Sequence, residues 1–184
     1  MRFAIIAQSA GMLATILFDN GFMLAYLSKI GICSADVLIF LSLPSLIIFV
    51  FLVPSAHMAD VFGKKMIGSI GLVGTIIGFA VISATGIFSF QSAISSIVFG
   101  ILVFSIGNAM FVSGWFALLD PIVPVQFRGR FFGNLRLSWH ITGVIFTLVV
   151  TAFLKLNPNI SVYQIIMVVV TLMLIIRLFW YAKL

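Results

Sequence analysis

The sequence is poor in charged residues and contains a single cysteine. Only 8% of the 184 residues are charged, whereas a soluble domain carries roughly 25%, so the chain lacks the polar groups needed to cover a water-facing surface. Cys33 alone excludes an intrachain disulfide and any metal cluster built on several cysteines. The two histidines, His57 and His140, lie on different predicted elements, and no phosphate-binding loop occurs. We therefore expect neither a metal nor a cofactor.

Apolar residues, in contrast, make up 63% of the chain and gather in six long runs. A helix that crosses a bilayer needs about 20 mostly apolar residues, and all six runs reach that length. Turn-forming residues such as Gly, Pro and Asn occur in the connections between the runs. We therefore predict an all-α integral membrane protein, with a single domain of six transmembrane helices over residues 1–184. The expected helices cover residues 3–28, 36–55, 65–85, 92–119, 134–154 and 161–182.

The basic residues are distributed unequally between the two ends of these helices. Basic residues favour the cytoplasmic side of a membrane, so we expect both termini in the cytoplasm and a multi-pass protein of the cell (inner) membrane. The net charge of +6 is then a sign of topology, and we expect a lipid bilayer and no nucleic acid as partner. One end holds Arg2, Lys64, Lys65, Arg128, Arg130, Arg136, Arg177 and Lys183, and the other holds Lys29 and Lys155.

The sixth run has few polar side chains, and we expect it at the lipid-facing periphery of the bundle. Its charged residue, Arg177, lies near the inner end of the run. A long basic side chain in that position can extend to the membrane interface. We therefore predict that Arg177 points toward the cytoplasmic interface.

Polar side chains form a stripe along the first predicted helix. Gln8, Thr15, Asp19 and Tyr26 recur at three- and four-residue multiples and so share one face. A charged carboxylate within a membrane costs about 2.5–3.5 kcal/mol on insertion scales, so Asp19 should face protein or a watery cavity. It is either a helix-packing carboxylate or a cavity-lining residue that contacts substrate or a coupling proton. Asn20 follows it directly.

Further polar positions occur on the fourth and fifth helices. The fifth carries Arg136, His140, Gly143, Thr147 and Thr151 on one face, and His140 is either a structural group or one that titrates near neutral pH. Because helices one, four and five hold most of the polar groups, we predict a cavity on one side of the bundle. The predicted substrate or proton path consists of Gln8, Thr15, Asp19, Asn20, Tyr26, Asn108, His140 and Thr147.

Glycines recur at helical spacing on the third and fourth helices. Small residues in register allow two helices to approach closely, and we interpret both sets as packing positions without a chemical role. The sets are Gly68, Gly71, Gly74 and Gly78, and, seven residues apart, Gly100, Gly107 and Gly114.

The connection between the second and third helices carries a motif. Residues 56–65 read Ala-His-Met-Ala-Asp-Val-Phe-Gly-Lys-Lys, which resembles the signature loop of the major facilitator superfamily, Gly-x-Leu-Ala-Asp-Arg-x-Gly-Arg-Lys. The matching positions are Asp60, Gly63, Lys64 and Lys65, whereas Ala56 and Val61 depart from the pattern. A second resemblance follows the fourth helix, where an acid and a proline precede an Arg-Gly pair. Its residues are Asp120, Pro121, Arg128, Gly129 and Arg130.

This resemblance implies the amino-terminal six-helix half of a transporter of that superfamily, with a 3+3 inverted repeat. It implies secondary active transport of a small solute by alternating access, together with a second six-helix half in a longer chain, a homodimer or a partner chain. Asp60, Lys64, Asp120 and Arg128 would then form a cytoplasmic charge network; the alternative is a set of solvated loop charges. Asp60 is also expected to cap the third helix, with Gly63 in the turn.

Two other function classes compete with transport. A non-transporting accessory or scaffold membrane subunit is compatible with the sequence, although such a subunit gains nothing from the costly Asp19. An intramembrane serine protease would need a Gly-x-Ser-Gly motif and a facing histidine; before Ser113 and Gly114, Phe111 stands in place of the first glycine. We therefore expect no catalytic residues and no enzymatic activity.

Overall fold

A computed structural model describes residues 2–85, 90–121 and 123–184, and all regular structure in these ranges is helical. Since apolar side chains dominate each segment, intrahelical hydrogen bonds are the only way to satisfy the backbone groups within a bilayer. The α-helices are α1 (Arg2–Asp19), α2 (Phe22–Ile30), α3 (Ser34–Phe62), α4 (Lys64–Ser83), α5 (Phe90–Leu119), α6 (Arg128–Leu156) and α7 (Ile160–Ala182), and a 3-10 helix, η2, covers Val125–Phe127.

Within the described ranges, five helices are long and apolar enough to cross a membrane. The sixth candidate span is the pair α1 and α2, which is bent by 53° at Asn20 and Gly21. An all-helical chain with these helices is compatible with a multi-pass integral membrane protein. The expected first helix over residues 3–28 is thus divided in two. The second and fifth expected helices are longer than predicted, because α3 continues to Phe62 and α6 begins at Arg128.

The bend is produced by a glycine with a left-handed backbone. Gly21 has φ 75° and ψ 0°, a conformation that residues with a Cβ adopt only at a cost. The Asn20 amide still donates to the Ile16 carbonyl at 2.9 Å, and the Ala25 amide donates to the Gly21 carbonyl at 3.0 Å. Each half of the broken span is therefore closed by its own hydrogen bonds, with Asp19 and Asn20 exposed at the junction.

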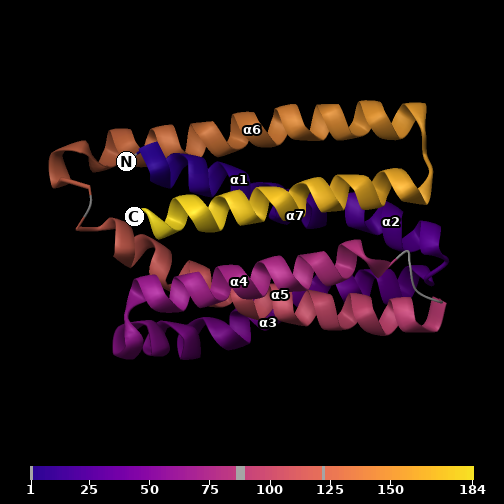
Figure 1. Cartoon of the computed structure of the whole chain (residues 1–184), viewed down its shortest axis with the longest axis horizontal. Coiled ribbons are helices and arrows are strands. Elements are labelled where there is room, and N and C mark those ends of the chain that lie inside the picture. Colours follow the sequence, from indigo (N-terminus) through magenta and orange to yellow (C-terminus); the bar gives the residue numbers. More distant parts are fainter. Residues whose placement is uncertain (1, 86–89, 122) are drawn as a thin grey trace.

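Successive spans run antiparallel (Figure 1). Both termini lie at the same end of the bundle as the turn from α3 to α4 and the connection from α5 to α6. In that view, α6 and α1 lie above α7, while α3, α4 and α5 lie below it. Helix α7 contacts α1, α2, α4 and α6. The prediction that the sixth run lies at the periphery holds for one face of α7, where Ile165, Leu172 and Phe179 are exposed, while the other face packs against α1 and α4.

The glycines of α4 and α5 form a close helix–helix contact, defined here as the glycine seam: Gly71 and Gly78 on α4, Gly100 and Gly107 on α5. A Cβ added at Gly71 would lie 2.5 Å from the Gly107 carbonyl oxygen, and one at Gly107 would lie 2.5 Å from that of Gly71. The backbones themselves are therefore in contact. Their interpretation as packing positions is confirmed, and the structure identifies them as partners.

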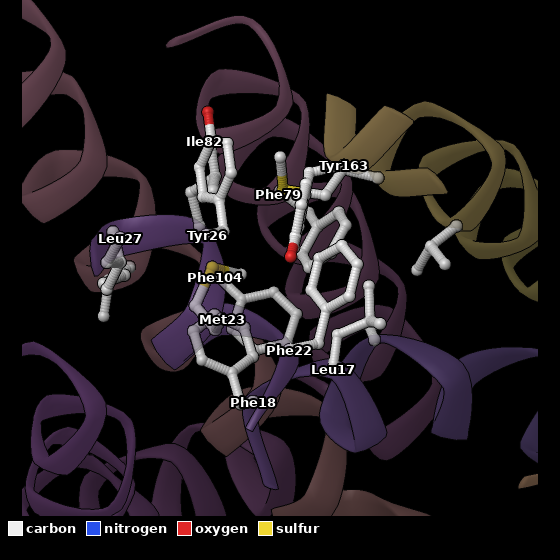
Figure 2. Close-up of a cluster of buried hydrophobic side chains, with 14 of the residues drawn as sticks. Leu17, Phe18, Phe22, Met23, Tyr26, Leu27, Phe79, Ile82, Phe104 and Tyr163 are labelled. Atoms are coloured by element: carbon white, nitrogen blue, oxygen red, sulfur yellow. The ribbon is translucent and has the colours of Figure 1, made fainter. Parts of the chain in front are cut away.

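A cluster of aromatic and aliphatic side chains connects the two groups of helices (Figure 2). It brings together residues of α1, α2, α4, α5 and α7. The rings of Phe18 and Phe104 stack at 5.2 Å between centroids, and the Phe22 and Tyr163 rings lie 5.1 Å apart. These contacts link the half of the bundle containing α1 to the half containing α4 and α5, and they hold the broken first span in place.

Candidate functional site

A depression with polar residues in its lining lies between α1 and α6. It is a cavity of about 390 Å³, which we call the α1–α6 cavity. The side-chain amide of Asn20 donates a 3.0 Å hydrogen bond to the hydroxyl of Thr147, so the break in the first span is connected to α6. Asp19 and His140 are both exposed on this side of the bundle. The cavity is lined by Met12, Ile16, Asp19, Asn20, Trp139, His140, Gly143, Val144, Thr147 and Leu148.

A second cavity adjoins the first and is lined by residues of α5 and α7 as well. Its volume is about 240 Å³, and it lies between α1, α5, α6 and α7, so we call it the inner cavity. Met12 and Trp139 line both cavities and therefore separate them. The inner cavity is lined by Gln8, Gly11, Met12, Thr15, Asn108, Phe111, Val112, Trp115, Phe116, Trp139 and Arg177.

These two cavities bring together seven of the eight residues that the sequence assigns to the substrate or proton path. The α1–α6 cavity holds Asp19, Asn20, His140 and Thr147, and the inner cavity holds Gln8, Thr15 and Asn108. The helical spacing of these residues on three separate helices is the reason that they converge.

Tyr26 is the path residue that the structure does not bring to either cavity. Its side chain is fully buried in the aromatic cluster, as Figure 2 shows, and its ring lies 6.0 Å from that of Tyr163. The Tyr26 hydroxyl is 2.6 Å from the Thr85 hydroxyl, which satisfies its hydrogen bonding. The 53° bend after Asp19 turns α2 away from the direction of α1, so the stripe predicted for one straight helix ends at the break.

Arg177 is a residue whose place the sequence reasoning missed. The prediction that it extends to the cytoplasmic interface was wrong, because its residue is only 5% exposed and its guanidinium packs against α1 and α5. Gly11 faces it, and a Cβ at Gly11 would collide with the guanidinium. The available signal was the arginine itself, since an ionisable residue inside an apolar run marks a functional site by default.

The motif between the second and third spans adopts a different local structure from the one expected. Helix α3 continues through Asp60 to Phe62, so Asp60 does not cap α4. Gly63 occupies the cap position instead, with φ 99° and no side-chain hydrogen bond. The turn that glycine permits is therefore present, one step after the last residue of α3.

Of the four residues expected to form a cytoplasmic charge network, the structure pairs two. Arg128 Nη2 lies 2.7 Å from a carboxylate oxygen of Asp120, and it also donates to the Asp120 backbone carbonyl at 3.3 Å. Asp60 and Lys64 form no ion pair within the described ranges, and neither do Lys65 and Arg130. Arg128 Nε donates to the carbonyl of Val123 at 3.4 Å, so this arginine also holds the connection between α5 and α6.

The Asp120–Arg128 pair is expected to contribute little to stability. Its side chains are 63% and 39% exposed, and exposed ion pairs typically contribute 0–1 kcal/mol. Asp120→Asn should therefore lower the free energy of unfolding by less than about 1 kcal/mol, measured by thermal unfolding in detergent. Arg128→Gln should cost more than Asp120→Asn, because it also removes the two donors to backbone carbonyls. A larger loss in Asp120→Asn would mean that the carboxylate has a further partner.

Comparison of the chain with models of protein families, with curated proteins and with solved structures finds no match.

Proposed function

We propose that this chain is one six-helix half of a secondary active transporter of the major facilitator type, and that it moves a small solute by alternating access together with a second six-helix half. The observation that carries the proposal is the polar side of the bundle formed by α1 and α6. Asp19, Asn20 and His140 are exposed there around a cavity of about 390 Å³. Lipid does not accept such groups.

His140 and Thr147 lie within α6, away from its two ends. His140 lies 12 residues after the start of α6, and Thr147 lies nine residues before its end. At 1.5 Å per residue these positions are about 18 Å and 13 Å from the two ends of the helix. Polar side chains at these positions are unfavourable in contact with lipid. A protein partner or water must cover them, and a cavity between two six-helix halves supplies both.

The pattern of helix contacts also supports the proposal. Helix α1 packs against α6 and α7, α5 packs against α3 and α4, and α4 packs against α7. Exchanging the first three spans with the last three replaces α1 by α5, α3 by α6 and α4 by α7, and the reverse. The α1–α6 contact then becomes the α5–α3 contact, and the α1–α7 contact becomes the α5–α4 contact. The α4–α7 contact is unchanged by this exchange. Equivalent contacts between spans of opposite direction are what a 3+3 inverted repeat would give.

The signature residues supply the third line of support. Gly63, Lys64 and Lys65 lie at the end of the bundle that also holds the termini and the Asp120–Arg128 pair. The resemblance in sequence therefore occurs at a consistent place in the structure: after the second span, on the basic end.

The proposal is tested by uptake into proteoliposomes. We expect the purified chain, alone as a homodimer or with a partner half, to accumulate one or more solutes from a radiolabelled panel of sugars, amino acids and organic acids. Native mass spectrometry of the detergent-solubilised complex should give a mass above the 20.1 kDa of one chain. A 20.1 kDa monomer with uptake equal to that of empty vesicles would contradict transport and favour an accessory subunit.

Asp19→Asn should reduce uptake at least tenfold, because it removes the only acid that lines the α1–α6 cavity. The side chain is exposed, so the variant should fold and elute from a sizing column like the wild type. Asp36→Asn is the matched control, since Asp36 is an exposed acid in the first turn of α3 and lines neither cavity. Normal uptake and unchanged pH dependence in Asp19→Asn would remove this carboxylate from the mechanism.

A further inference from the structure

Arg177 carries a buried positive charge in the inner cavity that no acid of this chain neutralises. The chain has four acids, Asp19, Asp36, Asp60 and Asp120, and none of them lines that cavity. The nearest along α1 is Asp19, eight residues from the Gly11 that faces the guanidinium, which is about 12 Å along the helix axis. Such a charge is unfavourable in a membrane unless another group compensates it.

The protein contacts of the guanidinium compensate it only in part. One Nη donates to the side-chain oxygen of Gln8 at 3.4 Å, and Cζ lies 3.8 Å from the centre of the Phe111 ring, a cation–π contact. The Nε of Arg177 has no acceptor. The guanidinium is nonetheless held in a defined place, because Gly11 leaves the space that it occupies.

Two further donors without acceptors belong to residues that line the same cavity. The indole Nε1 atoms of Trp115 and Trp139 are buried and form no hydrogen bond. Buried donors are nearly always paired in folded proteins. Among the described residues, four buried side-chain polar atoms lack a partner, and three of them, the two indole nitrogens and Arg177 Nε, belong to residues that line the inner cavity. A cavity beside one buried guanidinium and two unpartnered indole donors is suited to an acceptor that carries negative charge.

We propose that the inner cavity binds a small organic anion through a single carboxylate group. The guanidinium and the indole N–H groups donate to the carboxylate oxygens, since arginine presents its donors in a fork that fits this group. Phe111 and the ring of Trp115 contact the apolar body of the ligand, as in other small-molecule sites. One guanidinium balances one negative charge, so the ligand is a monoanion. As the identity of the transported solute, this inference rests on the proposed function; as a binding site it does not.

The site is tested by tryptophan fluorescence with benzoate as the probe and benzamide as its uncharged counterpart. Trp180→Phe provides the background, because the two remaining tryptophans, Trp115 and Trp139, both line the cavity. We expect a saturable change with benzoate and at least tenfold weaker binding of benzamide. Equal binding of both compounds, or no saturable binding of benzoate, would overturn the inference.

Variants locate the interaction. Arg177→Gln should weaken benzoate binding at least tenfold, while Arg130→Gln, the matched exposed arginine, should leave it unchanged. Without ligand, Arg177→Gln should melt at the same temperature as the wild type or higher, because the unpaired charge is gone, and benzoate should no longer raise its melting temperature. If that variant does not fold, Trp115→Phe keeps an aromatic ring at this position but removes one donor, and it should weaken binding several-fold. Undiminished binding in each folded cavity variant would exclude the site.

The outcomes separate this site from the transport proposal. Benzoate binding that depends on Arg177, without uptake of radiolabelled benzoate into proteoliposomes, would retain the site and contradict its role in transport. Uptake of other solutes by a chain that does not bind benzoate would retain transport and reject the anion site.

Discussion

Gly107→Ala is expected to prevent the chain from folding into this bundle. The added Cβ would lie 2.5 Å from the Gly71 carbonyl oxygen and 2.7 Å from the Thr75 amide nitrogen, which are backbone atoms of α4 that no rotamer change can move. Overpacking of a core, with the backbone shifts that it forces, typically costs 1–3 kcal/mol and occasionally more. We expect a loss of at least about 3 kcal/mol, seen as little folded protein on a sizing column and a much lower melting temperature.

Gly133→Ala is the matched control for this substitution. Gly133 also lies within an α-helix, α6, but a Cβ there meets nothing within 4 Å. The control should fold normally and be slightly more stable, since alanine is the better helix former by about 1 kcal/mol. If Gly107→Ala were as stable as Gly133→Ala, α4 and α5 would not be in direct backbone contact, and the arrangement of the central helices would have to be revised.

The glycine seam illustrates what sequence reasoning can and cannot give. The seven-residue spacing of Gly100 and Gly107 identifies a packing face, because only small residues permit close approach. The spacing says nothing about which helix approaches. Pairing α5 with α4 rather than with α1 depends on the lengths of the connections and on how all the apolar faces fill space together, which are properties of the whole chain.

For the candidate site, too, residue spacing predicts some positions and not others. Periodicity along straight helices placed Asp19, Thr147 and Asn108 on polar faces, and these faces do line cavities in the structure. Tyr26 lies outside both cavities because the left-handed backbone of Gly21 interrupts the helical periodicity of the first span. An Asn-Gly pair is a strong turn signal, but the apolar residues on both sides made one continuous span the simpler expectation.

Arg177 was misplaced for a different reason. Its distance from the end of the sixth run allowed either an interfacial or a buried arginine, and the deciding feature is a glycine 166 residues earlier in the chain. The contact of Arg177 with Gly11 and Gln8 is a tertiary relationship between α7 and α1. Residue spacing within one helix contains no information about it.

The second prediction with a large expected effect concerns the orientation of the bundle in the membrane. Cys33, the only cysteine, is exposed between α2 and α3, at the end of the bundle opposite the termini. A membrane-impermeant maleimide added to intact cells should label it at least ten times more strongly than it labels a Cys33→Ser/Lys65→Cys variant. That variant should react only after the membrane is permeabilised, because Lys65 lies at the basic end.

The structure changes the charge count behind this expectation but not its direction. Arg177 is buried in the bundle and so no longer belongs to the residues that set topology, which leaves seven basic residues at the end with the termini against Lys29 and Lys155 at the other. Such an excess on short connections directs that end to the cytoplasm. The opposite result would be labelling of the Lys65→Cys variant in intact cells and labelling of wild-type Cys33 only after permeabilisation. It would mean that the bundle has the opposite orientation in the membrane. The Asp120–Arg128 pair would then lie on the side of the membrane away from the cytoplasm, which contradicts a cytoplasmic role for that pair.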